Sequence, residues 1–264
     1  MIKGKLFSTV VSILMIFIIC IPAYAGDQQL IPEDLILDEY LDELAPESKS
    51  EYYEFASGLA QNLTSVSPSE YNHLIKKYCA DNTTELFTTA NNAIQASTAE
   101  PKIINVRLSD KATEQYELSY VLGDDELLTV SPTYLSIETL IVNESKAAST
   151  SYKSGTCEKT YYGTDGRVLF SLSVSCTFYY DGSSAWYKSG YSRSYSKGDL
   201  SVWQVTNWSG SHSASGSSYE ATCSGDFQWG YLFGTGLVIQ QFHCENTVIC
   251  SKSGVIAKIT TKTP

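Results

Sequence analysis

The sequence predicts an α+β protein: an acidic N-terminal helical segment with a few strands, followed by an all-β antiparallel, immunoglobulin-like sandwich. Charge divides the chain, because residues 26–150 hold 22 acidic and 7 basic residues, whereas residues 151–264 hold 7 acidic and 9 basic ones. All four tryptophans and 13 of the 17 glycines lie in the second part. There, apolar and polar residues alternate, which is the pattern of strands that bury one face.

The first 25 residues have the three parts of a secretory signal peptide. Lys3 and Lys5 give a positive start, residues 6–21 are mostly apolar, and Ala23-Tyr24-Ala25 offers a small-x-small cleavage site. We therefore expect a secreted, extracellular protein that is cleaved near Ala25, with no membrane span in the mature chain. The formal net charge of −11 disfavours non-specific binding to phosphate backbones, so no nucleic-acid partner is expected.

Residues 26–100 are predicted to form the acidic helical segment. Leu37, Tyr40, Leu41 and Leu44 recur at the three-four spacing of an amphipathic helix. The run Ser67–Glu70 combines an N-cap serine, a proline at the first helical position and a glutamate at the third. Helices are therefore predicted over 37–44, 52–63, 68–79 and 82–97.

Residues 101–143 are predicted to form a β segment. Apolar and aromatic runs over 103–108, 116–122, 127–130 and 134–142 predict strands, and Gly123–Glu126 predicts the turn between the second and third of them. Residues 144–155 are small and polar, so they are predicted to be a linker. The sandwich domain is then expected to span residues 156–264.

Two long alternating runs carry the sandwich prediction. In Val168–Tyr180, all seven even positions are apolar and most odd positions are serine or threonine. In Tyr219–Phe233, the odd positions form the apolar or aromatic face. Turn signals such as Asp165-Gly166 and Asp181-Gly182 separate such runs, and the repetition favours an antiparallel sandwich.

Six cysteines follow residue 25, and an even count in an exported protein permits disulfides. A tight turn near Asp165-Gly166 brings Cys157 alongside Cys176, and a turn near Gly234 brings Cys223 alongside Cys244. Each pair is expected to be close, either bonded or one pair-step off register. Cys79 and Cys250 are then left, and their pairing would tie the two halves together. The alternative is that all six are small buried thiols.

The sequence predicts no catalytic residues, no metal site and no cofactor. Ser194 and Lys197 match a Ser-x-x-Lys motif, but they lie in an alternating strand pattern and not at the start of a helix. His243 adjoins Cys244, and neighbours on a strand point to opposite faces, which argues against a Cys–His dyad. The cysteines also lack the Cys-x-x-Cys spacing of a zinc site.

Aromatic residues of the second part are the candidate binding residues. Trp186, Trp203, Trp208, Tyr191 and Tyr195 lie among Ser, Thr, Asn and Gly. Such surfaces stack on flat sugar faces or supply rigid contact area for a protein partner. The competing interpretation is that most aromatic rings of this part are core or cross-strand pairs.

Five short runs resemble uncharacterised secreted β-domain proteins of Gram-positive, often gut-dwelling bacteria: Tyr161–Gly163, Leu169–Leu172, Asp181–Tyr187, Gln204–Trp208 and Gly236–Gln240. The resemblance covers about residues 155–260. It implies export and a sandwich, and it brings no catalytic residues with it.

These observations favour a secreted, non-enzymatic binding module, with carbohydrate or a protein on a cell surface as its partner. Two alternatives belong to other classes. One is a secreted hydrolase whose site is formed by acids of the N-terminal half, and the other is a secreted toxin or bacteriocin-like effector.

Overall fold

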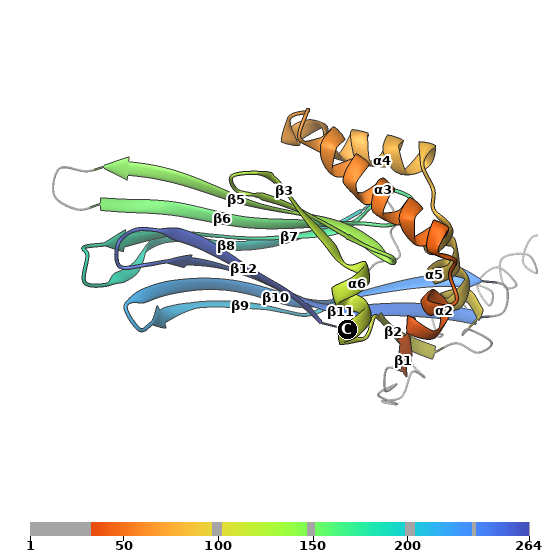
Figure 1. The fold of residues 1–264 in the computed structure, drawn as a ribbon. Coiled ribbons are helices and arrows are strands. Elements are labelled where there is room, and N and C mark those ends of the chain that lie inside the picture. The colour runs from red at the N-terminus through yellow and green to blue at the C-terminus, as the bar shows by residue number, and fades with distance from the viewer. Residues whose placement is uncertain (1–32, 97–101, 147–150, 199–203, 234–235, 264) are drawn as a thin grey trace, which may run out of the picture. The chain divides into compact units, whose positions relative to one another are not determined.

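Two six-stranded β-sheets form the body of the protein (Figure 1). In sheet A the strand order is β1-β2-β11-β10-β9, and β12 also pairs with β11. In sheet B the order is β3-β4-β5-β6-β7-β8. Sheet A contains β1 (Glu33–Ile36), β2 (Lys102–Arg107), β9 (Gln204–Ser215), β10 (Ser218–Phe233), β11 (Gly236–Cys250) and β12 (Ile256–Thr263). Sheet B contains β3 (Leu118–Gly123), β4 (Glu126–Ser131), β5 (Tyr134–Lys146), β6 (Ser151–Tyr162), β7 (Val168–Tyr180) and β8 (Ala185–Lys197).

The computed structural model describes residues 33–96, 102–146, 151–198, 204–233 and 236–263. The predicted signal peptide, residues 1–25, lies outside the described residues. None of the helices in these ranges has both the length and the apolar character needed to cross a membrane.

The sheets pack face to face, as the alternating runs predict. On β7 the burial alternates along the strand, and Phe170, Leu172, Val174 and Phe178 are buried between the sheets. Phe170 stacks on Phe227 of β10 with ring centroids 4.0 Å apart. The predicted α+β fold with an antiparallel sandwich is therefore confirmed.

The strand order adds a detail that the alternation alone does not contain. Successive strands are neighbours throughout β3–β8 and again through β9–β12. The sandwich is thus built from two meanders, which differs from the Greek-key order of immunoglobulin domains. The two short strands β1 and β2 join sheet A in parallel, through β11.

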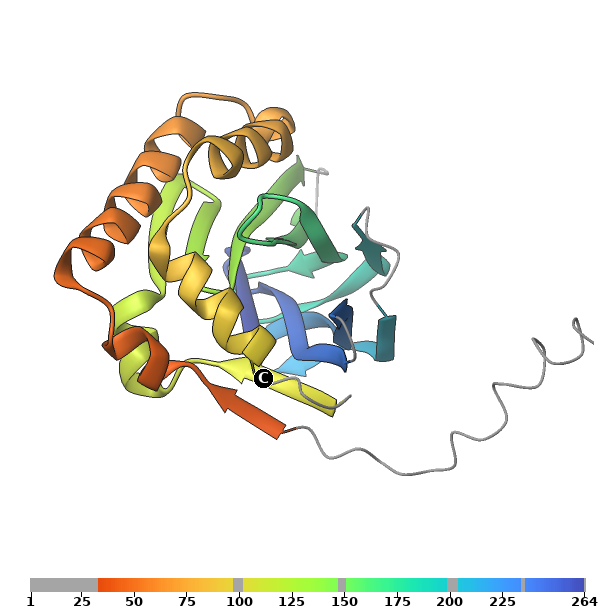
Figure 2. The same ribbon diagram turned by 90° about the vertical axis from the view of Figure 1, so that its right-hand side faces the viewer.

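A layer of helices covers one end of the other face of sheet B (Figure 2). The helices are α2 (Asp38–Asp42), α3 (Pro46–Leu63), the 3-10 helix η2 (Pro68–Glu70), α4 (Tyr71–Asp81), α5 (Glu85–Ala96) and α6 (Asp110–Tyr116). Their apolar faces bury a second core against Leu128, Val130, Leu135 and Ile137 of β4 and β5. On β5, Tyr134 belongs to the sandwich core and its neighbour Leu135 to the helix core, because successive strand residues point to opposite faces.

Most helices begin near the residues that predict their starts. Ser67 and Glu70 form the expected capping box, and the chain continues from η2 into α4. The second helix starts earlier than predicted, with Pro46 in its first turn. Helix α6 corrects the sequence prediction, which places no helix there and assigns Tyr116 to a strand. The Ser109 side chain accepts a hydrogen bond from the Ala112 N–H, which caps this short helix.

The predicted linker at 144–155 is wrong, because its described residues belong to strands. Residues 144–146 end β5, residues 151–155 begin β6, and the two segments pair with each other. The division into separate domains at this point is also wrong. Strands β3–β5 share sheet B with β6–β8, and Pro32–Pro264 form one compact unit. Small polar residues suit the solvent-facing side of a long hairpin as well as they suit a linker. The composition of this segment therefore does not distinguish the two.

Candidate functional site

Three of the predicted binding residues meet where the two sheets have facing edges. Strand β8 is the edge of sheet B and β9 is the edge of sheet A. Tyr191 and Tyr195 of β8, together with Tyr187 of the same strand, face Trp208 and His212 of β9. We call these five residues the aromatic seam. Trp203 lies outside the described residues.

The rings of the aromatic seam are held in place by one another. Tyr187 stacks on His212 with centroids 4.4 Å apart and an interplanar angle of 21°. Tyr195 meets Trp208 edge to face at 5.0 Å. The guanidinium of Arg193 lies 5.7 Å from the Trp208 ring, within cation–π range.

The residues of the aromatic seam differ in how much of their surface is exposed to solvent. Tyr187 is 38% exposed and Tyr195 is 41% exposed. Tyr191 is half-buried, and its hydroxyl donates to the Thr222 carbonyl at 3.0 Å, which is a structural contact. Trp208 is also half-buried, because Gly225 leaves room for its ring: a Cβ at Gly225 would lie 2.9 Å from Trp208 Cε3.

Trp186 is separated from the seam. It precedes Tyr187 on β8, so its side chain points to the opposite, solvent-facing side of sheet B. There it packs on Tyr179 at 5.8 Å, and Tyr179 in turn contacts Tyr152 at 6.1 Å. The ammonium of Lys188 lies 2.9 Å from the Tyr152 ring centroid. The predicted aromatic residues of β8 therefore fall on the two faces of this edge strand.

The six cysteines are all buried and unbonded in the described structure. Cys157 is paired with Val174, and Cys176 with Gly155, so these two cysteines are diagonal neighbours one pair-step apart. Cys223 and Cys244 have the same relationship, opposite Asn246 and Gly225. Diagonal Cβ atoms are roughly 7–8 Å apart, whereas a disulfide needs roughly 3.5–4.5 Å.

The expected tie between Cys79 and Cys250 is wrong. Cys79 is buried in the helix core and Cys250 in the sandwich core. Burial raises the pKa of the Cys79 thiol to about 12 and that of the Cys250 thiol to about 11. Both therefore behave as small apolar residues at neutral pH.

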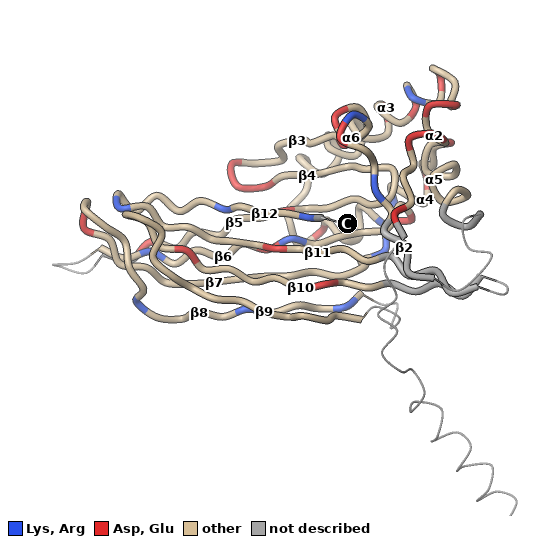
Figure 3. Tube along the Cα trace, turned by 90° about the horizontal axis from the view of Figure 1, so that it is seen from below, with Lys and Arg blue, Asp and Glu red and all other residues tan. Residues whose placement is uncertain are grey.

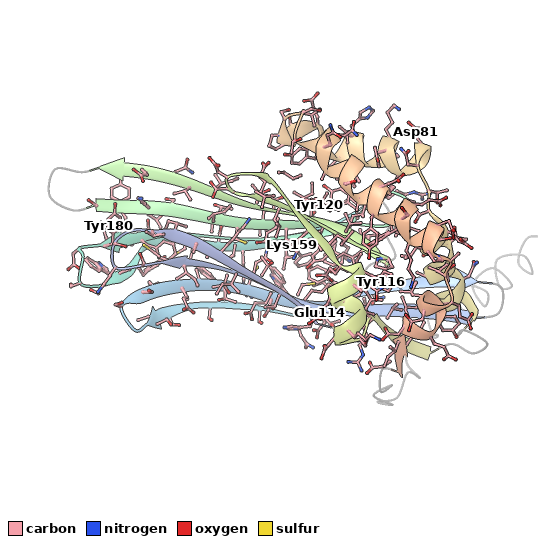
Figure 4. All side chains as sticks on the ribbon, in the orientation of Figure 1. Asp81, Glu114, Tyr116, Tyr120, Lys159 and Tyr180 are labelled. Carbon is pink, nitrogen blue, oxygen red and sulfur yellow. The ribbon has the colours of Figure 1, made fainter. Side chains whose placement is uncertain are left out.

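A cavity of about 580 Å³ is the feature that the sequence analysis missed. Strands β2, β4, β6 and β12 and helix α6 contribute to its wall, and Figure 4 labels one of the lining residues, Lys159 on β6. Its charged lining residues are Arg107, Asp110, Glu117, Lys159 and Lys262. Figure 3 shows acidic and basic residues together on helix α6, with others spread over the strands of both sheets. No local sequence motif joins them.

Lys262 is the most unusual of these residues. It pairs with the buried Cys244 across β11 and β12, so its side chain points inward. Its ammonium lies 3.7 Å from the centroid of the Tyr134 ring and 4.1 Å from that of Phe242. Burial lowers the pKa of Lys262 to about 8, although Cys244 and Glu117 act in the opposite direction.

A buried ionic cluster lies next to the cavity. Glu138 of β5 is 6% exposed and lies 3.4 Å from the Lys159 ammonium and 3.5 Å from that of Lys258. The Thr260 hydroxyl also donates to the Glu138 carboxylate. Charge thus joins β12 of sheet A to β5 and β6 of sheet B, whereas the aromatic seam joins the β9 and β8 edges of the two sheets.

His243 has a partner of its own on the outer face of sheet A. Its Nδ1 lies 2.7 Å from Asp226 Oδ1, and the Asn207 side-chain amide donates to Asp226 Oδ2 at 2.5 Å. Cys244 points into the core, so His243 and Cys244 lie on opposite faces of β11.

Comparison of the chain with protein families, with curated proteins and with solved structures gives no match.

Proposed function

We propose that the protein is a secreted, non-enzymatic carbohydrate-binding module whose ligand stacks on the aromatic seam. One observation carries this proposal: Tyr187 and Tyr195 expose about two fifths of their surface while their rings are fixed against His212 and Trp208. A ring that is already immobilised loses little entropy when a ligand covers it. Tyrosine and tryptophan also combine an apolar face with a polar edge, which suits a sugar ring.

The surroundings of the seam support a polar ligand. On the seam side of β8, Arg193 pairs with Val174 and Lys197 with Phe170, and the strand holds no acidic residue. Aromatic rings next to basic groups offer stacking together with hydrogen bonds to sugar hydroxyls.

Secretion is part of the proposal, and it is supported by the signal-peptide pattern of residues 1–25. Expression in a secreting Gram-positive host, followed by N-terminal sequencing of the protein in the medium, tests it. We expect the mature chain to begin at Gly26. Protein that stays in the cell with Met1 intact contradicts the secretion part of the proposal.

Glycan binding is tested with a glycan array and four variants. We expect Tyr187→Ala and Tyr195→Ala to weaken the best glycan at least tenfold, because each removes an exposed ring of the seam. Trp186→Ala changes the other face of β8 and should leave binding within twofold. Tyr40→Ala is the matched control, since Tyr40 is 39% exposed on helix α2.

Two results would count against this assignment. If no glycan binds, or if all four variants bind alike, the seam is not a carbohydrate site. If the seam variants instead abolish binding to one purified surface protein, the seam is a protein interface.

A further inference from the structure

The Lys262 ammonium lies at the wall of the cavity, and no carboxylate oxygen of the described residues is in contact with it. Its inward position on β12 places the ammonium over the Tyr134 and Phe242 rings. Within the described ranges, no carboxylate oxygen lies within 4.0 Å of this ammonium. Two aromatic faces attract a cation but do not neutralise it, so the ammonium keeps most of its charge.

The neighbouring lysines show that this arrangement is not general. Lys159 and Lys258 are also mostly buried, and both approach the same carboxylate, that of Glu138. An enclosed ion is normally paired because desolvation is costly. The Lys262 ammonium has no such pairing with a carboxylate among the described residues. It lies at the wall of a cavity that is large enough for a small molecule.

The rest of the lining defines what such a molecule must offer. Threonine and serine hydroxyls surround the cavity at Thr113, Ser131, Thr133, Thr260 and Thr261. Asp110 and Glu117 add carboxylates on the α6 side, and Glu117 already accepts a hydrogen bond from the Tyr134 hydroxyl at 2.9 Å. Carboxylates and threonines bind ligand hydroxyls well, whereas two carboxylates repel a doubly charged phosphate.

We propose that this cavity binds a small sugar acid, with the carboxylate of the ligand against the Lys262 ammonium and its hydroxyls toward the threonines and Glu117. This site is separate from the aromatic seam and does not depend on it. Of the three basic side chains in the lining, Arg107 and Lys159 already pair with Asp34 and Glu138, which leaves the Lys262 ammonium for the single negative charge of the ligand. A neutral sugar lacks the group that Lys262 requires.

Binding should take up protons near pH 8. The pKa of Lys262 is about 8 because it is buried, so about half of the molecules carry a neutral amine at that pH. The groups that face this amine are Glu117, Tyr134, Lys159 and Cys244. A carboxylate placed against the amine favours the charged form and raises its pKa. The uptake approaches half a proton at pH 8 and vanishes at pH 6.

Isothermal titration calorimetry of the mature protein with glucuronate tests the proposal. Glucose lacks the carboxylate and acetate lacks the hydroxyls, and both should bind at least tenfold more weakly than glucuronate. Titrations with trigalacturonate and with galacturonate distinguish two possible origins of the sugar acid. If trigalacturonate binds more tightly than galacturonate, the ligand is the end of an acidic polysaccharide. If the two bind with equal affinity, the ligand is a free sugar acid.

Lys262→Met removes the ammonium while it keeps an apolar side chain of similar length at an inward position. We expect it to fold, to weaken glucuronate binding at least tenfold, and to lose the proton uptake measured in two buffers of different ionisation enthalpy. Lys77→Met is the matched control, because Lys77 lies exposed on α4 beside Asp81. It should bind glucuronate like the wild type.

The proposal is overturned if glucuronate binds no tighter than glucose, or if folded Lys262→Met binds glucuronate with unchanged affinity and proton uptake. Tyr195→Ala separates the two proposals, since it alters the seam and not the cavity. Glucuronate binding that survives in Tyr195→Ala leaves the cavity proposal intact, even where the seam binds no glycan.

Discussion

Gly155 of β6 lies directly against Val248 of β11, at a point where the two sheets approach closely. A Cβ atom at position 155 would lie 2.6 Å from Val248 Cγ2 and 2.7 Å from Ile256 Cγ2. Both distances are shorter than a carbon–carbon contact allows. A residue that the sequence pattern assigns to a linker is therefore part of the packing between the sheets.

Gly155→Ala should destabilise the protein by about 1–3 kcal/mol, because a methyl group forced into a filled core displaces its neighbours. Gly123→Ala is the control, since a Cβ at Gly123 meets only the Glu126 carboxylate at 3.6 Å, an ordinary contact. Urea denaturation followed by tryptophan fluorescence measures both. Equal midpoints for the two variants would show that the sheets can separate locally without cost.

Glu138→Gln should cost about 3–5 kcal/mol, because it leaves the Lys159 and Lys258 ammonium groups enclosed without a counter-charge. Asp81→Asn offers a comparison on the surface. Its pair with Lys77 is exposed and should contribute less than about 1 kcal/mol. Chemical denaturation of both variants measures the difference, and a cost for Glu138→Gln as small as that of Asp81→Asn would contradict the structural role of the cluster.

The alternating runs predict the sandwich because burial imposes a period of two on a strand. Val168–Tyr180 shows this most clearly, because its even positions from Phe170 onward face sheet A, whereas Val168 packs against the helix core. The division into two halves fails for a different reason. Charge asymmetry describes the surface, and it does not decide which strands pair, so β5 and β6 join across the predicted boundary.

The aromatic seam could be predicted in part, and the cavity could not. Tyr191, Tyr195 and Trp208 are visible as an aromatic cluster in the sequence, but whether the β8 and β9 edges face each other depends on how the sheets stack. The cavity joins Asp110 and Lys262, which are remote in the sequence and belong to no shared motif. Lysine is usually exposed, and Lys262 lies in a polar run of the sequence. Only the tertiary packing shows that its side chain points inward.

The cysteines should behave as six protected thiols. Burial raises the pKa of Cys157, Cys176 and Cys223 to about 12, so little thiolate forms at neutral pH. Alkylation with iodoacetamide should be slow in the native protein, and six adducts should form after unfolding without a reductant. Mass spectrometry counts them. Fewer than six adducts on the unfolded, unreduced chain would show that disulfides form despite the diagonal register.

The pH dependence of stability should reveal the enclosed charge of Lys262. Its pKa is about 8 in the folded protein and 10.5 for a lysine in water, so the unfolded chain binds more protons between these values. The lysine therefore weakens the folded state below pH 8, and this cost is removed as the pH rises to 10.5. The difference between the two pKa values limits the change to roughly 3 kcal/mol.

Lys262→Met isolates this effect from the other groups that titrate in the same range. The buried thiols with raised pKa make both proteins less stable above pH 9, because the unfolded chain then loses protons that the folded chain keeps. That slope is shared, so it cancels in the difference between wild type and variant. We expect the variant to lose its advantage over the wild type steadily from pH 8 to pH 10.5 in urea titrations under reductant. A difference that stays constant over this range would mean that Lys262 titrates in the folded protein as it does in water, and that its ammonium is not enclosed.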